Sequence, residues 1–271
     1  MIHRQELIRQ ALEAVKIAED GAYVGPSGRR VEIAAEVKAA IARTVDHRPE
    51  EPVPFEPRPR FETKVRVVNC TSLELAHRLT HGGDDVLILN FASALSPGGG
   101  FLNGAVAQEE SLARSSALYA AIAPSPMYAH HAHGDAFYSD WMIWSPQVPV
   151  FRDDVSGHLL ETPYLASFLT APAPYAVEVR RSHPSRIHEL ATVMHRRIER
   201  SLTLATMHGH TKLVLGAWGC GAFENDASMV AETYKRALAV LFAGVFDEVV
   251  FAVLDHTPDH RYIAPFEARF S

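Results

Sequence analysis

Cysteine is scarce in this sequence, and its scarcity excludes several kinds of site. Cys70 and Cys220 are the only two cysteines in 271 residues. They stand too far apart in sequence to indicate a zinc site or a disulfide framework, and low cysteine content suits a reducing compartment. We predict that both are small buried residues and not reactive thiols. No metal and no cofactor are expected.

An excess of positive charge is missing as well. The chain has 26 Lys and Arg against 32 Asp and Glu, a formal net charge of −6. Because neutralising phosphates requires a basic surface, direct nucleic-acid binding is not expected. No apolar run could span a bilayer, and the N-terminus lacks the apolar core of a signal peptide. We therefore expect a globular protein that acts in the cytoplasm and does not bind membranes.

The first sixty residues differ from the rest of the chain. Apolar spacing predicts amphipathic helices over residues 4–19 and 31–45. Residues 48–59 hold five prolines, which predicts an extended linker or strap. We interpret residues 1–60 as a helical extension with this proline-rich strap, and residues 61–271 as the main domain.

The main domain alternates short apolar, β-branched runs with helical stretches, which predicts a layered α/β sheet. Its middle, residues 127–184, is irregular, and its prolines predict only short or edge strands at 141–144, 148–151 and 168–170. Residues 130–135 hold three histidines and an aspartate, which we interpret as a solvated polar loop. The expected strands elsewhere are 65–68, 86–90, 213–216 and 249–254, and the expected helices are 72–79, 111–122, 187–207 and 227–242.

Residues 96–110 carry the strongest chemical pattern. Three consecutive glycines at 98–100 follow a predicted buried strand, and Gln108-Glu109-Glu110 opens the next predicted helix. Glycines let backbone N–H groups turn toward one anion, and a helix N-terminus adds its positive end. A mobile glycine turn and solvated helix-capping acids are the alternatives, but this context favours a site for a phosphate-bearing ligand.

A second glycine loop, residues 217–226, occupies the same position after a strand and before a helix. In α/β sheets such loops lie at the carboxyl ends of the strands, where ligands bind. Two such loops could hold a diphosphate between them. Neither contains the Gly-Lys-Ser/Thr of nucleotide triphosphatases, and the spacing of Gly98 and Gly100 in the first loop does not fit the dinucleotide fingerprint.

These residues resemble a known family. Three glycines, seven residues and then Gln-Glu-Glu is similar to the signature of poly(ADP-ribose) glycohydrolases, whose catalytic domain is a macrodomain. Further motifs resemble the bacterial-type branch of the family, and the resemblance covers most of residues 60–260. It implies a macrodomain-like three-layer α/β/α sandwich with a mixed sheet over residues 61–271. The supporting motifs are the segments 90–93, 101–104, 111–116, 148–154 and 216–221.

The resemblance implies hydrolysis of the ribose–ribose bond of poly(ADP-ribose), with ADP-ribose as product and poly(ADP-ribosyl)ated proteins as partners. Glu110 would be the catalytic acid, Glu109 a positioning contact to the ribose, and Asn90 would hold the ribose next to the scissile bond. The two glycine loops would wrap the diphosphate, and Phe223 would pack against the ligand. The implied ligand-binding residues are Asn90, Gly98, Gly99, Gly100, Asn103, Gln108, Gly219, Cys220, Gly221, Ala222 and Phe223.

Adjacent residues at a helix start diverge by about 100°. Glu109 and Glu110 therefore cannot bracket a glycosidic bond as ordinary glycosidase carboxyl pairs do. We infer that one carboxyl group performs both proton transfers. Two of these residues also have a purely structural interpretation. Phe223 could be a buried core aromatic, and Asn90 could cap a turn. Thr71 and Asp255 are candidates for adenine contacts.

Two other functions stay open from the sequence. One is a macrodomain hydrolase that removes single ADP-ribose groups from protein or nucleic acid. The other is a module that binds ADP-ribose without turnover, although such a module has no need of a proton donor. The resemblance also suggests a role in reversing ADP-ribosylation after DNA damage.

Overall fold

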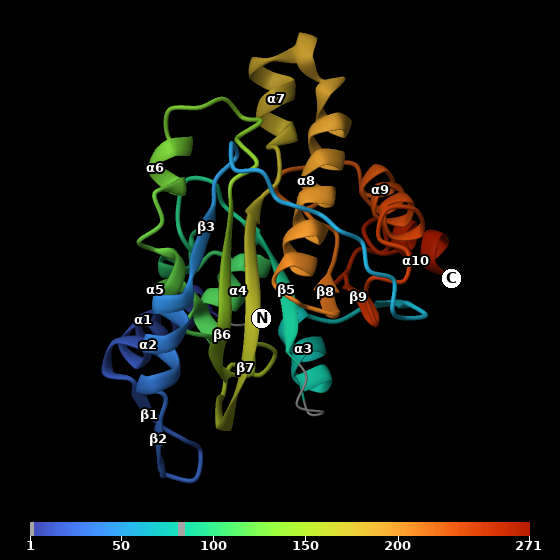
Figure 1. The fold of residues 1–271 in the computed structure, drawn as a ribbon. Helices are drawn as coiled ribbons and strands as arrows, with labels where there is room; N and C mark the ends of the chain where they lie inside the picture. The colour runs from blue at the N-terminus through green and yellow to red at the C-terminus, as the bar shows by residue number, and fades with distance from the viewer. Residues whose placement is uncertain (1–2, 81–84) are drawn as a thin grey trace.

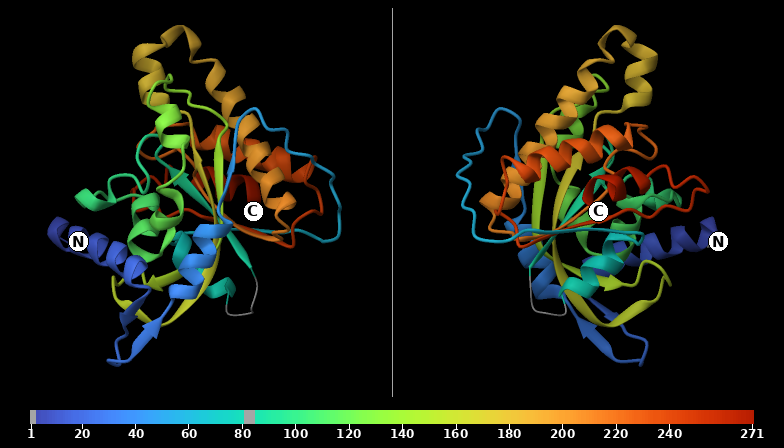
Figure 2. Two further views of the ribbon diagram at one scale, coloured as in Figure 1. Left: turned by 60° about the vertical axis from the view of Figure 1, so that its left-hand side comes forward. Right: turned by 90° about the vertical axis from the view of Figure 1, so that its right-hand side faces the viewer.

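A seven-stranded mixed sheet forms the centre of the molecule, with helices on both faces (Figures 1 and 2). This computed structural model describes residues 3–80 and 85–271. The strand order is β3-β6-β7-β5-β8-β9-β4, and β7, β5, β8, β9 and β4 run parallel. The strands β3 (Val45–His47) and β6 (Met142–Arg152) lie at one side of the sheet, and each pairs antiparallel with its neighbour. The predicted three-layer α/β/α fold is confirmed.

The described elements agree with most of the predicted order along the chain. The remaining strands are β1 (Ala22–Val24), β2 (Arg30–Glu32), β4 (Lys64–Val68), β5 (Val86–Ala92), β7 (Leu159–Pro172), β8 (Lys212–Leu215) and β9 (Glu248–Ala252). The longer helices are α1 (Arg4–Asp20), α2 (Ala34–Arg43), α3 (Ser72–Thr80), α4 (Gln108–Ser115), α8 (Glu189–Met207) and α9 (Ala227–Ala239). The shorter helices are η1 (Phe101–Asn103), α5 (Leu118–Ile122), α6 (Met127–His131), α7 (Ala176–Ser182), η2 (Pro184–Arg186) and α10 (Ala264–Phe270).

Alternating side chains of the central strands divide the core into two layers. In β5, Val86 and Ile88 face the layer that contains α1 to α5, whereas Leu87 and Leu89 face α8, α9 and α10. A strand that is buried on both faces needs apolar residues at every position, which explains the continuous apolar run. Burying the two faces against separate helical layers holds β5 rigidly at the middle of the sheet.

The N-terminal residues are continuous with the main domain in this structure. Strand β3 pairs with β6 in the central sheet, and Ile33 and Val37 belong to the same core as Ile88. The boundary expected near residue 60 therefore does not coincide with a break in the sheet or core. The first two residues of that predicted extension lie outside the described residues.

The predicted helix over residues 31–45 is too long at both ends. Val31 lies in strand β2, and Val45 lies in strand β3, opposite Trp144 of β6. Both residues are β-branched and fit a pleated strand. The helix is limited to Ala34–Arg43.

The predicted proline-rich strap crosses the α8 side of the sheet between β3 and β4 (Figures 1 and 2). The guanidinium of Arg200 on α8 donates hydrogen bonds to the carbonyls of Arg48 and Glu51. Further along, the ring of Phe55 lies 4.6 Å from that of Phe242. These contacts fix an otherwise extended segment to the surface.

The prediction of short or edge strands in the middle of the chain was wrong. The candidate segments belong to two long strands, β6 and β7, and β7 is paired on both sides. Pro146 lies at an irregularity between Ser145 and Val148, where Gln147 has φ 51°. Such a bulge accommodates a residue that has no N–H to donate. Pro146 therefore interrupts the ladder locally without ending β6.

Two other local predictions need correction. The helix expected over 111–122 is split into α4 and α5, because Ser116 is extended (φ −145°, ψ 173°) and pairs with Val150. The histidine-rich segment is not wholly a solvated loop. His130 and His131 lie on α6, and His131 is 3% exposed with its Nε2 2.6 Å from Ser139 Oγ.

A second buried histidine group lies where β3 and β6 meet the loop after α8. His47 Nε2 is 2.8 Å from His208 Nε2, and the indole of Trp144 stacks on His208 at 3.6 Å. Trp144 Nε1 also donates to His210 Nε2. Burial lowers the pKa of His208 from 6.5 to about 4, and the neighbouring His47 adds to that effect.

This histidine group makes stability depend on pH. An unfolded histidine takes up its proton near pH 6.5, whereas folded His208 does so only near pH 4. The stabilisation is therefore complete above about pH 6.5 and is lost as the pH falls toward 4. We expect the midpoint of urea unfolding to be lower at pH 5 than at pH 7, with a smaller difference in His208→Gln. His158→Gln, in an exposed loop, is the control. Equal midpoints at the two pH values would contradict this assignment.

None of the helices in residues 3–80 and 85–271 combines the length and apolar character needed to cross a membrane.

Candidate active site

A cavity of about 630 Å³ opens at the carboxyl ends of the parallel strands. Its walls include the ends of β5 and β9, the segments that follow β4, β7 and β8, and most of α4. Helix α1 and the β6–β7 turn complete one side. This is the position at which open α/β sheets bind ligands. Both glycine loops were predicted to lie at the carboxyl ends of the strands and to contact a ligand there. Of the two groups of glycines, only those of the second loop line the cavity.

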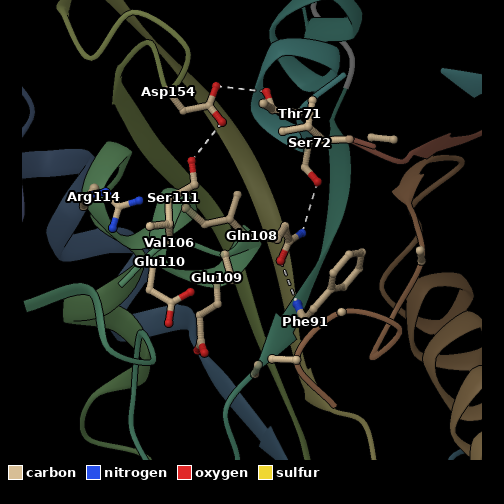
Figure 3. Close-up of a pocket in the computed structure, with 18 of the residues that line it drawn as sticks. Thr71, Ser72, Phe91, Val106, Gln108, Glu109, Glu110, Ser111, Arg114 and Asp154 are labelled. Atoms are coloured by element: carbon tan, nitrogen blue, oxygen red, sulfur yellow. Dashed lines mark hydrogen bonds between the residues drawn. The ribbon is translucent and has the colours of Figure 1, made fainter. Parts of the chain in front are cut away.

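Glu109 and Glu110 both line this cavity (Figure 3). They extend from the first turn of α4 in the same direction, and they are only 3% and 9% exposed. Glu109 Oε2 accepts a hydrogen bond from the N–H of Ser93 at 2.6 Å. Glu110 Oε1 accepts one from the N–H of Gly100 at 2.9 Å. Two backbone donors from the segment between β5 and α4 therefore orient the two carboxyl groups.

The two carboxyl groups have different environments. Burial raises the pKa of Glu109 well above its ordinary value, and the nearby Glu110 carboxyl raises it further. The N–H groups of Ser93 and Gly98 oppose this shift. Because a carboxyl in such a place favours its neutral form, Glu109 adds little negative charge beside Glu110.

The first glycine loop packs against these carboxyl groups. Gly98 and Gly99 have φ values of 70° and 60°, a backbone conformation that favours glycine. A Cβ at Gly99 would collide with Glu110 Oε1 and would lie 3.0 Å from Glu109 Oε2. The N–H of Gly99 donates to the carbonyl of Ser96. The loop therefore places backbone directly on the carboxyl groups, and residues 98–100 are not among the described residues that line the cavity.

Gln108 ties the start of α4 to strand β5. Its Oε1 accepts from the N–H of Phe91 at 2.9 Å, and its Nε2 donates to the carbonyl of Leu89 at 2.7 Å and to Ser72 Oγ (Figure 3). The Gln108 side chain thus bonds a backbone N–H and a backbone carbonyl near the end of β5. The bonds fix the helix N-terminus, and with it the two glutamates, against the sheet.

The second glycine loop, residues 217–226, contributes directly to the cavity wall. Gly219, Gly221, Ala222 and Phe223 line it, whereas Cys220 is buried behind the loop with its pKa raised to about 12 by that burial. Gly219 has φ 73°, and a Cβ there would lie 2.6 Å from Ala173 Cβ. The ring of Phe223 stacks on Tyr175 with centroids 4.6 Å apart.

Asn225 holds this second loop in place. Its Nδ2 donates to the carbonyls of Pro174 and Gly219, at 2.8 and 3.1 Å. The indole of Trp218 donates to the carbonyl of Ala171 in β7. These bonds fix the loop to strand β7 and to the segment that follows it.

Of the remaining sequence-predicted residues, Asn90, Asn103 and Asp255 lie outside the cavity wall. Asn90 is fully buried in β5, and its Nδ2 donates to Thr170 Oγ1 at 3.1 Å. Asn103 lies in η1, where its carbonyl accepts from Arg4. Of the two adenine candidates, Thr71 lines the cavity, whereas the Asp255 carboxylate accepts hydrogen bonds from Thr257 and the following turn.

Sequence reasoning gave Asp154 and Ser111 no role in the site, although it named Thr71 as a candidate for an adenine contact. Asp154 lines the cavity, and its carboxylate accepts hydrogen bonds from Thr71 Oγ1 and Ser111 Oγ, both at 3.0 Å (Figure 3). Burial raises its pKa, and the two hydroxyl groups oppose that shift. Asp154 lies in the turn that follows β6. Three segments far apart in sequence form this cluster, so no local pattern could reveal it.

Within residues 3–80 and 85–271, no group of three or more His, Cys, Asp or Glu side chains could hold a metal ion.

Comparison with known proteins matches residues 11–153 to the family model of the microbial-type PARG catalytic domain. The chain is also similar to solved structures. It shares 46% identity with poly(ADP-ribose) glycohydrolase from Thermomonospora curvata bound to the inhibitor ADP-HPD, over 98% of this chain and 100% of that one, with a TM-score of 0.90. No curated protein sequence matched.

A second similar structure is the Deinococcus radiodurans poly(ADP-ribose) glycohydrolase in complex with ADP-ribose, at 38% identity and a TM-score of 0.82. That match covers 89% of this chain and 99% of the other. Fold and cavity together define a macrodomain-type glycoside hydrolase. The chain belongs to the microbial-type poly(ADP-ribose) glycohydrolase family.

Proposed function

We propose that this chain hydrolyses ribose–ribose O-glycosidic bonds of poly(ADP-ribose) and releases ADP-ribose, with Glu110 as the acid and base. Its partners are the polymer and poly(ADP-ribosyl)ated proteins in the cytoplasm. The observation that carries the proposal is the pair of buried carboxyl groups at the first turn of α4. They stand at the edge of a nucleotide-sized cavity and are oriented by backbone N–H groups. A module that only bound ADP-ribose would not need them.

The chemistry follows from one carboxyl group. Protonated Glu110 donates its proton to the departing 2′-oxygen while the bond from that oxygen to C1″ of the distal ribose breaks. The ribose passes through an oxocarbenium-like state. The resulting Glu110 carboxylate then removes a proton from water as the water oxygen bonds to C1″, which restores the acid. Glu109, whose pKa is raised by burial, positions the ribose hydroxyl groups.

The diphosphate is proposed to lie against the second glycine loop, because residues 98–100 of the first loop do not line the cavity. The second loop supports this placement because Gly219 and Gly221 present backbone to the cavity, and Phe223 stands at its edge. A diphosphate bent toward the distal ribose would also stabilise positive charge that develops at C1″. Asn90 and the loop at 98–100 are proposed to act from behind the carboxyl groups, by holding them in place.

A hydrolase that removes single ADP-ribose groups is the main alternative, and substrate choice separates the two. We expect the purified chain to release ADP-ribose rapidly from poly(ADP-ribose), and to leave a mono-ADP-ribosylated protein unchanged over the same time. Free ADP-ribose is measured by chromatography in parallel reactions. Release from the mono-ADP-ribosylated protein alone would identify the chain as the hydrolase of single ADP-ribose groups. Binding of ADP-ribose without any release would identify it as a binding module.

A further inference from the structure

Two buried arginines in the cavity wall have no role in the proposed chemistry. Arg114 is on α4, four residues after Glu110, and Arg152 ends strand β6. They are 5% and 2% exposed. A buried guanidinium is costly unless its donors are bonded, so the partners of these groups indicate what they hold.

Arg152 binds three separate segments at once. Its Nε donates to the carbonyl of Arg114 in the last turn of α4 at 3.0 Å, and one terminal nitrogen donates to the carbonyl of Gly157 at 3.0 Å. The other terminal nitrogen bonds Glu13 of α1 at 2.9 Å. A cation at this position also complements the C-terminal end of α4. Arg152 therefore fixes the end of the helix whose first turn carries the glutamates.

Arg114 continues the connection toward the glycine loop. Its terminal nitrogen donates to the carbonyl of Ala105 at 2.7 Å. The N–H of Ala105 donates to the carbonyl of Gly100 at 3.1 Å, and the N–H of Gly100 donates to Glu110 at 2.9 Å. An unbroken series of hydrogen bonds thus joins Glu13 on α1 to the carboxyl group of Glu110.

Helix α1 supports the same loop from the other side. Arg4 Nε donates to the carbonyl of Asn103 at 2.9 Å, and Gly104 (φ 73°) allows the backbone of Arg4 to approach closely. Residues 103–105 are therefore held between an arginine of α1 and an arginine of α4. The orientation of the Gly100 N–H depends on both contacts.

We propose that Arg114 and Arg152 are positioning residues for the hydrolysis reaction. They hold residues 100–105 so that the Gly100 N–H orients the carboxyl group of Glu110. This inference rests on the proposed role of Glu110. It also gives α1 a part in catalysis, because Glu13 balances the buried charge of Arg152.

The test replaces each arginine with lysine. Lysine keeps the positive charge but cannot reproduce the planar set of donors. We expect Arg114→Lys and Arg152→Lys each to lower kcat about tenfold or more, because small misplacements of a catalytic group have large effects. KM for the polymer and Kd for ADP-ribose are expected to stay within about threefold. Arg66→Lys, an exposed arginine on edge strand β4 that pairs with Glu248, is the control.

Calorimetric titration with ADP-ribose counts the folded binding sites in each preparation. Because kcat is then expressed per binding site, a smaller folded fraction in a variant does not lower its kcat. If both arginines act through one series of bonds, kcat of the double variant should be only slightly lower than kcat of the less active single variant. The proposal would be overturned if the lysine variants kept the wild-type kcat per site or changed only KM. It would also be overturned if the reduction of kcat in the double variant equalled the product of the two single reductions. Glu110→Gln is measured alongside. If it is inactive while the lysine variants are normal, only this inference fails; if it is active, the proposed function fails.

Discussion

Replacing Glu110 with glutamine is expected to lower kcat for poly(ADP-ribose) by about 10³-fold or more, the range of a lost general acid and base. Glutamine has nearly the same shape, and its amide oxygen can still accept the Gly100 N–H. It cannot donate a proton to the 2′-oxygen or accept one from water. Binding of ADP-ribose should therefore persist, with Kd within about threefold of wild type. The measurement pairs polymer turnover with calorimetric binding.

A matched control for this variant is Glu36→Gln. Glu36 is the acidic residue in the first turn of α2, so the substitution changes the same residue type at the same helical position away from the cavity. Wild-type turnover is expected. Near-normal hydrolysis by Glu110→Gln would remove the residue from the mechanism, and loss of ADP-ribose binding would instead assign it a binding role.

The second large effect is expected from Gly99→Ala. The added Cβ would collide with Glu110 Oε1 and crowd Glu109 Oε2, and alanine is strained at φ 60°. The carboxyl groups and the loop cannot both keep their positions. Because a displacement of about 1 Å can reduce rate about 10²-fold, we expect a loss of at least that size in kcat.

Gly134→Ala serves as the control for the glycine variant. A Cβ there would have an ordinary contact, 3.6 Å from the carbonyl of His131, and its φ is not in the left-handed range. Both variants are checked by circular dichroism and by ADP-ribose binding. Wild-type turnover in a folded Gly99→Ala protein would show that the close packing of the loop on the glutamates is not needed.

Local patterns were sufficient to place the glutamates. A continuous apolar run, three glycines and two acids before helix-forming residues specify a strand, a turn and a helix start over about thirty residues. That order puts the acids at the carboxyl end of a buried strand, because the elements are adjacent in sequence. The burial of both faces of β5 and the second loop after β8 follow from the same reasoning.

Contacts between distant segments could not be predicted in this way. Arg152 bonds Glu13 across 139 positions, and Asp154 bonds Thr71 across 83. The position of Gly100 against Glu110 likewise depends on the packing of the loop. Sequence motifs included both Arg114 and Arg152, but apart from Glu13 their partners are carbonyl groups, which leave no signature in residue type.

The prolines of β6 and β7 led to the wrong prediction of short or edge strands for a related reason. Whether a proline ends a strand depends on where its missing N–H would fall in the ladder, and that depends on the partner strand. The bulge at Ser145 to Val148 places Pro146 where no regular pairing is required. Pairing partners, and so tolerance of proline, are set by tertiary structure.

The central claim is that this chain turns over poly(ADP-ribose) through Glu110. Its most direct test is a time course of free ADP-ribose released from excess purified polymer by wild-type protein, with Glu110→Gln as the parallel reaction. The account predicts many molecules of ADP-ribose per molecule of wild-type protein and almost none from the variant. No release by the wild-type protein, or equal release by both proteins, would contradict it.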